Sequence, residues 1–168
     1  RLEPKDLATA FDRLAALPLD QLDRYGEISI KRMREEVEYA VRRHGVTLVV
    51  IDHLHYALGV RKAGEDERLL IDAAAQAITT MALDLGIHVV LVMHPGKIKT
   101  GEDGKPREPD IGDLKGSSGP SQFADNIARL ARYENGRSTL AFLKVRSELG
   151  KLGHIVYAFD DETLRFTD

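Results

Sequence analysis

Two short apolar segments on either side of one long helical pattern constrain the fold of this chain more than any other feature. The first is the segment 46–51, which is rich in β-branched residues and is followed by Asp52. The second spans residues 87–93 and is followed by His94. Continuous apolar segments of this length are typical of strands buried on both faces of a parallel sheet. The helix predicted over residues 66–85 would then be the crossover that joins two parallel strands.

The remaining pattern predicts three further helices and a set of short strands. Helical spacing and capping residues place the helices at 3–16, 29–44 and 120–130. The C-terminal strands, separated by turn residues, are expected at 139–146, 154–159 and 164–166. On the long central helix we expect one apolar face, made of Leu69, Leu70, Ala73, Ala77, Met81 and Leu85. Together these elements predict an α/β fold, with a mostly parallel sheet flanked by helices and a C-terminal antiparallel hairpin.

Composition excludes several classes of function. The 168 residues contain no cysteine, so disulfide scaffolds, thiolate metal sites and cysteine nucleophiles are ruled out. The formal net charge of −3 gives no whole-chain signal for nucleic acid, so any such binding must be local. The longest apolar segment is far shorter than the roughly 18 residues that a membrane span needs. The length fits one domain.

Polar residues at the ends of the two predicted strands are candidates for ligand binding. Ligands of open parallel sheets bind beyond the carboxyl ends of the strands. Asp52 could hold Mg²⁺ there, directly or through water, or it could cap the next turn. His94 could serve the same site or be a satisfied histidine before a turn. His53 and His55 suggest zinc, but the three or four converging ligands that zinc requires are not evident in the sequence.

Two further features could bind anions. Lys144 and Arg146 are two residues apart on a predicted strand, so both project from one face and could bind a phosphate, or simply face solvent. The polar stretch 96–119 is long for a connection within a domain and ends in the sequence 113–119, DLKGSSG, before a helix. Backbone N–H groups in such loops bind anions, although a plain linker has the same composition. No Walker A sequence, Gly-x-x-x-x-Gly-Lys-Ser/Thr, occurs in the chain.

Taken in order, these features resemble the second half of a RecA-type helicase domain of the DnaB, Twinkle and bacteriophage primase-helicase family. The strand 48–53 resembles the Walker B element, and the strand 89–95 resembles the one that ends in a γ-phosphate sensor. The other matching motifs are the helix start at 66–72, the DNA-facing loop and helix at 113–126, and a terminal hairpin with Lys144-x-Arg146 and 160–166. The resemblance covers about residues 45–166 and rests on these five motifs occurring together in the family's order.

The resemblance implies a role for each matched residue near the nucleotide. Asp52 would help to place Mg²⁺ through water, and His94 would sense the γ-phosphate of ATP or another NTP and signal to the DNA loop. Lys144 and Arg146 would reach the ATP held by the adjacent subunit, as trans-acting fingers do. The implied cofactors are therefore ATP and Mg²⁺.

The resemblance also implies partners. Lys115, Gly116 and Ser117 would contact the backbone of single-stranded DNA in the channel of a ring. Identical subunits would form that ring, expected to be hexameric, and a primase domain or primase is a further expected partner. The protein would be cytoplasmic, in a bacterial, phage or nucleoid-associated setting, with an organellar location as the open alternative. Residues 1–168 would form a single, partial RecA-like ATPase domain, with 96–119 as a mobile DNA-facing loop.

Two family features have no assigned counterpart here, namely the Walker A loop and the glutamate that activates water. Residues 2–4, Leu-Glu-Pro, echo the setting of that glutamate, but the spacing downstream fits a later helix better. The chain alone is therefore expected not to hydrolyse ATP. We favour the interpretation that it is the C-terminal portion of a replicative helicase. The alternatives are a degenerate module for DNA binding or assembly without catalysis, and a RecA-like ATPase of recombination.

Overall fold

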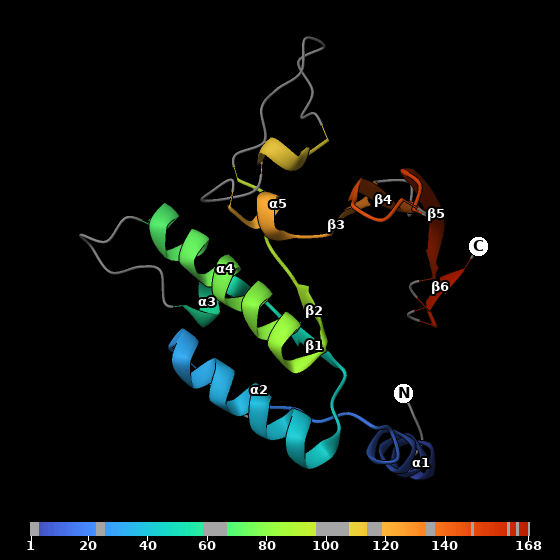
Figure 1. Ribbon diagram of the computed structural model, residues 1–168. Helices are drawn as coiled ribbons and strands as arrows, with labels where there is room; N and C mark the ends of the chain where they lie inside the picture. The colour runs from blue at the N-terminus through green and yellow to red at the C-terminus, as the bar shows by residue number, and fades with distance from the viewer. Residues whose placement is uncertain are drawn as a thin grey trace.

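The computed structural model describes residues 4–22, 26–58, 67–96, 108–113, 119–133, 137–148, 150–160, 162–163 and 165–167. The helices are α1 (Pro4–Ala15), α2 (Ile30–His44), α3 (Leu54–Ala57), α4 (Glu67–Leu85), the 3₁₀ helix η1 (Ile111–Asp113) and α5 (Gly119–Phe123) (Figure 1). The strands are β1 (Leu48–Ile51), β2 (His88–Leu91), β3 (Asn126–Arg132), β4 (Arg137–Val145), β5 (Gly153–Asp160) and β6 (Arg165–Thr167). The fold is α/β, as the sequence pattern predicted.

The described strands form two sheets. Strands β1 and β2 are parallel, with Leu48 paired to His88 and Ile51 to Leu91, so the predicted helical crossover through α4 is confirmed. The second sheet is antiparallel, in the order β3-β4-β5-β6. Among the described strands, β2 pairs only with β1 and β3 only with β4. Each sheet therefore has two edges that no described strand pairs, at β1 and β2 in the first sheet and at β3 and β6 in the second.

The core lies between the β1–β2 sheet and two helices. Helices α2 and α4 run beside one another over one face of this sheet (Figure 1). The core cluster consists of Met33, Ile51, Leu54, Ile71, Ala74, Ile78 and Met81, with Val49, Val89 and Leu91 packed against it. Apolar burial on this face is the main stabilising contribution to this half of the molecule.

Burial on both faces of the two strands was the wrong expectation for the described residues. Alternate strand residues point to the other face of the sheet, where Leu48 is 54% exposed, Val50 60% and Val90 48%. Helices α2 and α4 cover only one face, and side chains of a strand alternate between faces. The described chain therefore leaves an apolar sheet face open.

The central helix buries a face rotated from the predicted one. Ile71, Ala74 and Ile78 are buried on α4, whereas Leu69 is 67% exposed. Of the predicted face, Met81 is in the core and Leu85 packs against it. The helix is rich in alanine and leucine on several sides, so apolar spacing alone does not select the face that meets the sheet.

Helix α2 has the ends that the sequence predicted. The Ser29 hydroxyl accepts a hydrogen bond from the backbone N–H of Arg32 at 3.2 Å, which caps the first turn. Gly45 follows the helix in the left-handed conformation, with φ of 70°, and its N–H donates to the carbonyl of Val41.

The helix predicted over 120–130 is wrong beyond its first turn. Helix α5 ends at Phe123, and the chain continues as β3, which pairs with β4 from Asn126↔Val145 to Arg132↔Ser138. Alanine, leucine and arginine in this segment favour a helix locally, but strand pairing with β4 overrides that preference. None of the described helices is both long and apolar enough to cross a membrane.

Candidate functional site

The carboxyl ends of β1 and β2 lie side by side and carry the two predicted sheet-end residues. The pairing continues past the strands, because Val92 N–H donates to the Ile51 carbonyl at 2.9 Å and Leu54 N–H donates to the Val92 carbonyl at 3.4 Å. These bonds hold the turn that begins at Asp52 beside the segment that leads to His94. Both side chains are exposed, so they face the space beyond the sheet where ligands of parallel sheets bind.

A histidine contact joins the two strand ends. The rings of His53 and His94 meet edge to face, with centroids 4.5 Å apart. The His55 ring lies 6.5 Å from that of His53, and its Nε2 is 3.8 Å from a carboxylate oxygen of Glu67 at the start of α4. His94 is thus held next to the residue that follows Asp52.

The carboxylate of Asp52 is an oxygen donor at this edge of the sheet. A single exposed carboxylate, Asp52, is an oxygen ligand of the kind that Mg²⁺ prefers, with water filling most of the remaining positions. In the part of the chain that the structure describes, no group of three or more His, Asp or Glu side chains converges as a metal site. A zinc site would need three or four such converging ligands.

Lys144 and Arg146 lie at the other sheet, at the end of β4. As their spacing predicted, both side chains extend in the same direction, toward α5 and the residues after it. The Lys144 ammonium donates to the Ser121 carbonyl at 2.7 Å. The Arg146 guanidinium donates to the Gln122 carbonyl at 3.0 Å and to the carboxylate of Asp125 at 2.7 Å. The two cations therefore share one small region of the surface.

The predicted DNA-contact residues Lys115, Gly116 and Ser117 lie outside the described residues. The segments on either side of them are well fixed. Gly96 N–H donates to the Asp113 carbonyl at 2.6 Å, so the two ends of the stretch 96–113 meet. Arg129 of β3 donates to the Pro109 carbonyl at 2.8 Å and forms an ion pair with Glu108. The loop sequence is thus bounded by segments anchored to β3 and α4.

The sequence matches the DnaB-like helicase C-terminal domain over residues 2–168. This chain belongs to that family. A DnaB-like domain of this kind accounts for the helices and strands described above, and the family resemblance drawn from the motifs is confirmed.

Individual proteins are similar to this chain in sequence or in fold. The DnaB-like chain is 29% identical to the DNA helicase/primase of Enterobacteria phage T3 over an alignment of 117 residues. The alignment covers 68% of this chain and 20% of the phage protein. A solved ATPase domain superposes with a TM-score of 0.83 at 22% identity, covering 98% of this chain and 59% of that one. A solved DnaB-like replicative helicase, described with its primase interactions, gives a TM-score of 0.81 at 22% identity, covering 96% and 40%. This chain therefore spans only part of the length of these relatives.

Two residues beside the predicted site have contacts that the sequence of this DnaB-like domain did not predict, since His53 was considered only as a zinc ligand. His53 contacts His94, and Asp125 binds Arg146. Asp125 is 21 residues from Arg146 in the sequence, and only the register of β3 against β4 brings them together. The adjacency of His53 to Asp52 was the one available signal for the histidine.

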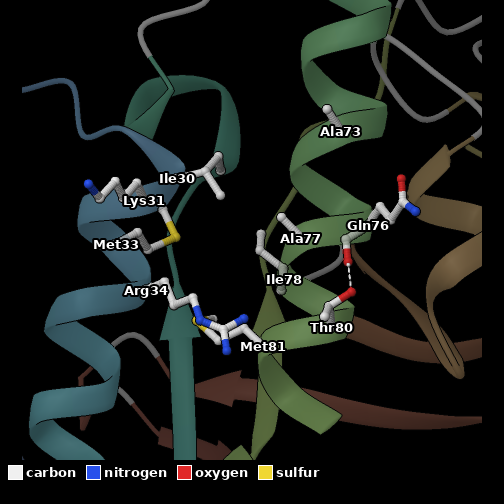
Figure 2. Close-up of a pocket in the computed structure, with 10 residues that line it drawn as sticks. All are labelled: Ile30, Lys31, Met33, Arg34, Ala73, Gln76, Ala77, Ile78, Thr80 and Met81. Atoms are coloured by element: carbon white, nitrogen blue, oxygen red, sulfur yellow. Dashed lines mark hydrogen bonds between the residues drawn. The ribbon is translucent and has the colours of Figure 1, made fainter. Parts of the chain in front are cut away.

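A pocket of about 330 Å³ lies elsewhere on this DnaB-like domain, between α2 and α4 (Figure 2). It is lined by Ile30, Lys31, Met33, Arg34, Ala73, Gln76, Ala77, Ile78, Thr80 and Met81. None of the candidate nucleotide or DNA residues is among them, so the pocket is separate from the proposed site.

Proposed function

We propose that this chain is the C-terminal part of an ATP-driven ring helicase that unwinds duplex DNA at replication forks. The observation that carries the proposal is the position of Asp52 and His94 at the same edge of a parallel sheet, where His53, the neighbour of Asp52, contacts the His94 ring. A carboxylate that holds Mg²⁺, here Asp52, and a γ-phosphate sensor, here His94, must lie at the same edge because both act on the phosphate end of one nucleotide.

Asp52 would hold Mg²⁺ through ordered water, and the ion when bound would offset negative charge on the nucleotide phosphates. The carboxylate is exposed and free to accept hydrogen bonds from metal-bound water. His94, on the neighbouring strand, would donate a hydrogen bond to the γ-phosphate. Loss of that phosphate would release the imidazole of His94. The resulting movement of His94 would be passed along the chain toward the predicted DNA loop.

Lys144 and Arg146 would serve the nucleotide of the adjacent subunit. They lie on the antiparallel sheet, whereas Asp52 and His94 lie on the parallel one. Arginine fingers stabilise charge that develops on the transferring phosphoryl group. A planar guanidinium has five N–H donors, so Arg146 can keep its bonds to Gln122 and Asp125 and still bind a phosphate.

Lys115, Gly116 and Ser117 would contact the backbone of single-stranded DNA in the channel. Ammonium and backbone N–H donors bind phosphate oxygens without reading sequence, which suits an enzyme that translocates along any strand. The family resemblance, and the fixed segments on either side of these residues, support this assignment.

The assembled ATP site would need a P-loop that this sequence does not contain. The sheets offer places for such a strand, because the outer strands β1, β2, β3 and β6 each have an edge that no described strand pairs. Open edges of this kind are normally covered or paired in native proteins. We infer that in the assembled ATP site a strand that carries the P-loop pairs at such an edge, and that this chain alone does not hydrolyse ATP.

Strand displacement by the full-length protein tests the proposal. The wild type should separate a forked duplex only with ATP and Mg²⁺, and Arg146→Ala should lose turnover by roughly a thousandfold or more while nucleotide binding is nearly unchanged. ATP hydrolysis without strand displacement would instead favour a RecA-like ATPase of recombination. DNA binding without any hydrolysis would favour an assembly module.

A further inference from the structure

Arg146 makes three hydrogen bonds, one to Gln122 in the last turn of α5 and two to Asp125, which directly precedes β3. Its backbone N–H donates to the Asp125 carbonyl at 2.9 Å. One terminal nitrogen of its guanidinium donates to Asp125 Oδ1 at 2.7 Å, and the other donates to the Gln122 carbonyl at 3.0 Å. Two different acceptors, on different sides of the guanidinium, fix its plane as well as its position.

This ion pair contributes little to stability. The Arg146 side chain is 56% exposed and that of Asp125 is 69% exposed, and exposed ion pairs are weak because water screens them. The ion pair instead restricts the conformation of the Arg146 side chain. An unrestrained arginine samples many rotamers, and ordering it at a phosphate costs conformational entropy.

We propose that Asp125 is a positioning residue for Arg146, holding the guanidinium in the direction from which it reaches the nucleotide of the neighbouring subunit. The proposal rests on the function proposed above for Arg146. The acceptors on Asp125 and Gln122 occupy two N–H groups and leave other donors for the phosphate. Asp125 itself touches neither the nucleotide nor the reacting atoms.

The same contacts connect the finger to α5, the helix that follows the predicted DNA-contact residues in the sequence. Helix α5 begins at Gly119, two residues after Ser117, and it supplies the carbonyl of Ser121 to Lys144 and that of Gln122 to Arg146. A DNA-induced displacement of α5 would therefore move both cations. We infer that Asp125 and α5 transmit DNA binding in one subunit to hydrolysis in the next.

The test measures ATP hydrolysis by the full-length helicase with and without single-stranded DNA. Asp125→Ala should lower kcat with DNA by about tenfold and lower the stimulation by DNA, while the nucleotide Kd changes by less than about twofold. Asp125→Asn keeps an acceptor oxygen and should restore part of the lost rate. Thermal midpoints of both variants should stay within about 2 °C of wild type, because the pair is exposed.

Asp84→Ala is the matched control. It removes an exposed ion pair of the same 2.7 Å length, between Arg34 and Asp84, away from the finger. Wild-type kcat and DNA stimulation in Asp125→Ala, or equal losses in Asp125→Ala and Asp84→Ala, would overturn the positioning role. If kcat is reduced in Arg146→Ala and unchanged in Asp125→Ala, this inference alone is rejected. If kcat is unchanged in Arg146→Ala, the proposed function is rejected as well.

Discussion

Gly119 at the start of α5 lies directly against Asp72 of α4. A Cβ at position 119 would lie 1.8 Å from Asp72 Oδ1 and 3.0 Å from Asp72 Cα. A side chain at position 119 would clash with Asp72. Glycine at this position therefore allows α5 to approach α4 closely. The segment that carries the acceptors for Lys144 and Arg146 depends on this approach.

Gly119→Ala should therefore destabilise the protein by about 1–3 kcal/mol, because the added methyl group forces α5 or Asp72 to move. Urea denaturation measures the change. Gly112→Ala is the control, since a Cβ at Gly112 meets no atom within 4 Å. Equal stability of the two variants would show that the α4–α5 contact is not as close as described.

Ile71→Ala should cost about 2–5 kcal/mol of unfolding free energy, because Ile71 is fully buried in the core and the truncation leaves a cavity. Leu69, two residues away on the same helix, is 67% exposed, so Leu69→Ala should cost less than about 1 kcal/mol. Similar losses for the two variants, measured from urea midpoints at constant m, would mean that α4 buries the face predicted from the sequence instead.

Asp160 should make the terminal hairpin sensitive to acid. The Thr163 hydroxyl and the backbone N–H groups of Glu162 and Thr163 donate to its carboxylate, and these bonds lower the pKa of Asp160 below its ordinary value of 3.8. A lowered folded pKa means that the stabilisation is fully present above the unfolded value and is lost as pH falls through the folded one.

NMR titration of the Asp160 carboxyl measures this pKa directly. Thr163→Val removes the largest cause of the shift and should return the pKa toward 3.8. Asp160→Asn should be less stable than wild type at neutral pH, and the difference should vanish in acid. A difference that is constant with pH would contradict the assignment.

Lys115→Ala in the full-length protein should weaken binding of single-stranded DNA and reduce the slope of log K against log salt by about 0.7, the value for one phosphate contact on a single strand. Fluorescence anisotropy with labelled DNA at several salt concentrations gives the slope. An unchanged slope would show that Lys115 makes no phosphate contact.

Local pattern predicted most of the fold because each element carries its own signals. Ser29 and Gly45 mark the ends of α2, and the apolar segments on either side of α4 are the strands β1 and β2. The sheet-end positions of Asp52 and His94 follow from parallel topology, which places the carboxyl ends of both strands at one edge.

The parts that depend on contacts distant in sequence could not be predicted in this way. Strand β3 has helix-forming residues and becomes a strand only through pairing with β4. The same pairing brings Asp125 to Arg146, and the face of α4 that is buried depends on where the sheet lies against it. Periodicity reports the local conformation, whereas these features are set by packing between elements.

The most direct test of the central claim is subunit mixing. Asp52→Asn and Arg146→Ala full-length proteins, each inactive alone, should recover ATP turnover when mixed, because a competent site needs Asp52 from one subunit and Arg146 from the next. Random assembly should restore about one quarter of the wild-type sites. Recovery to that level would support a trans-acting finger, and a mixture as inactive as its components would contradict it.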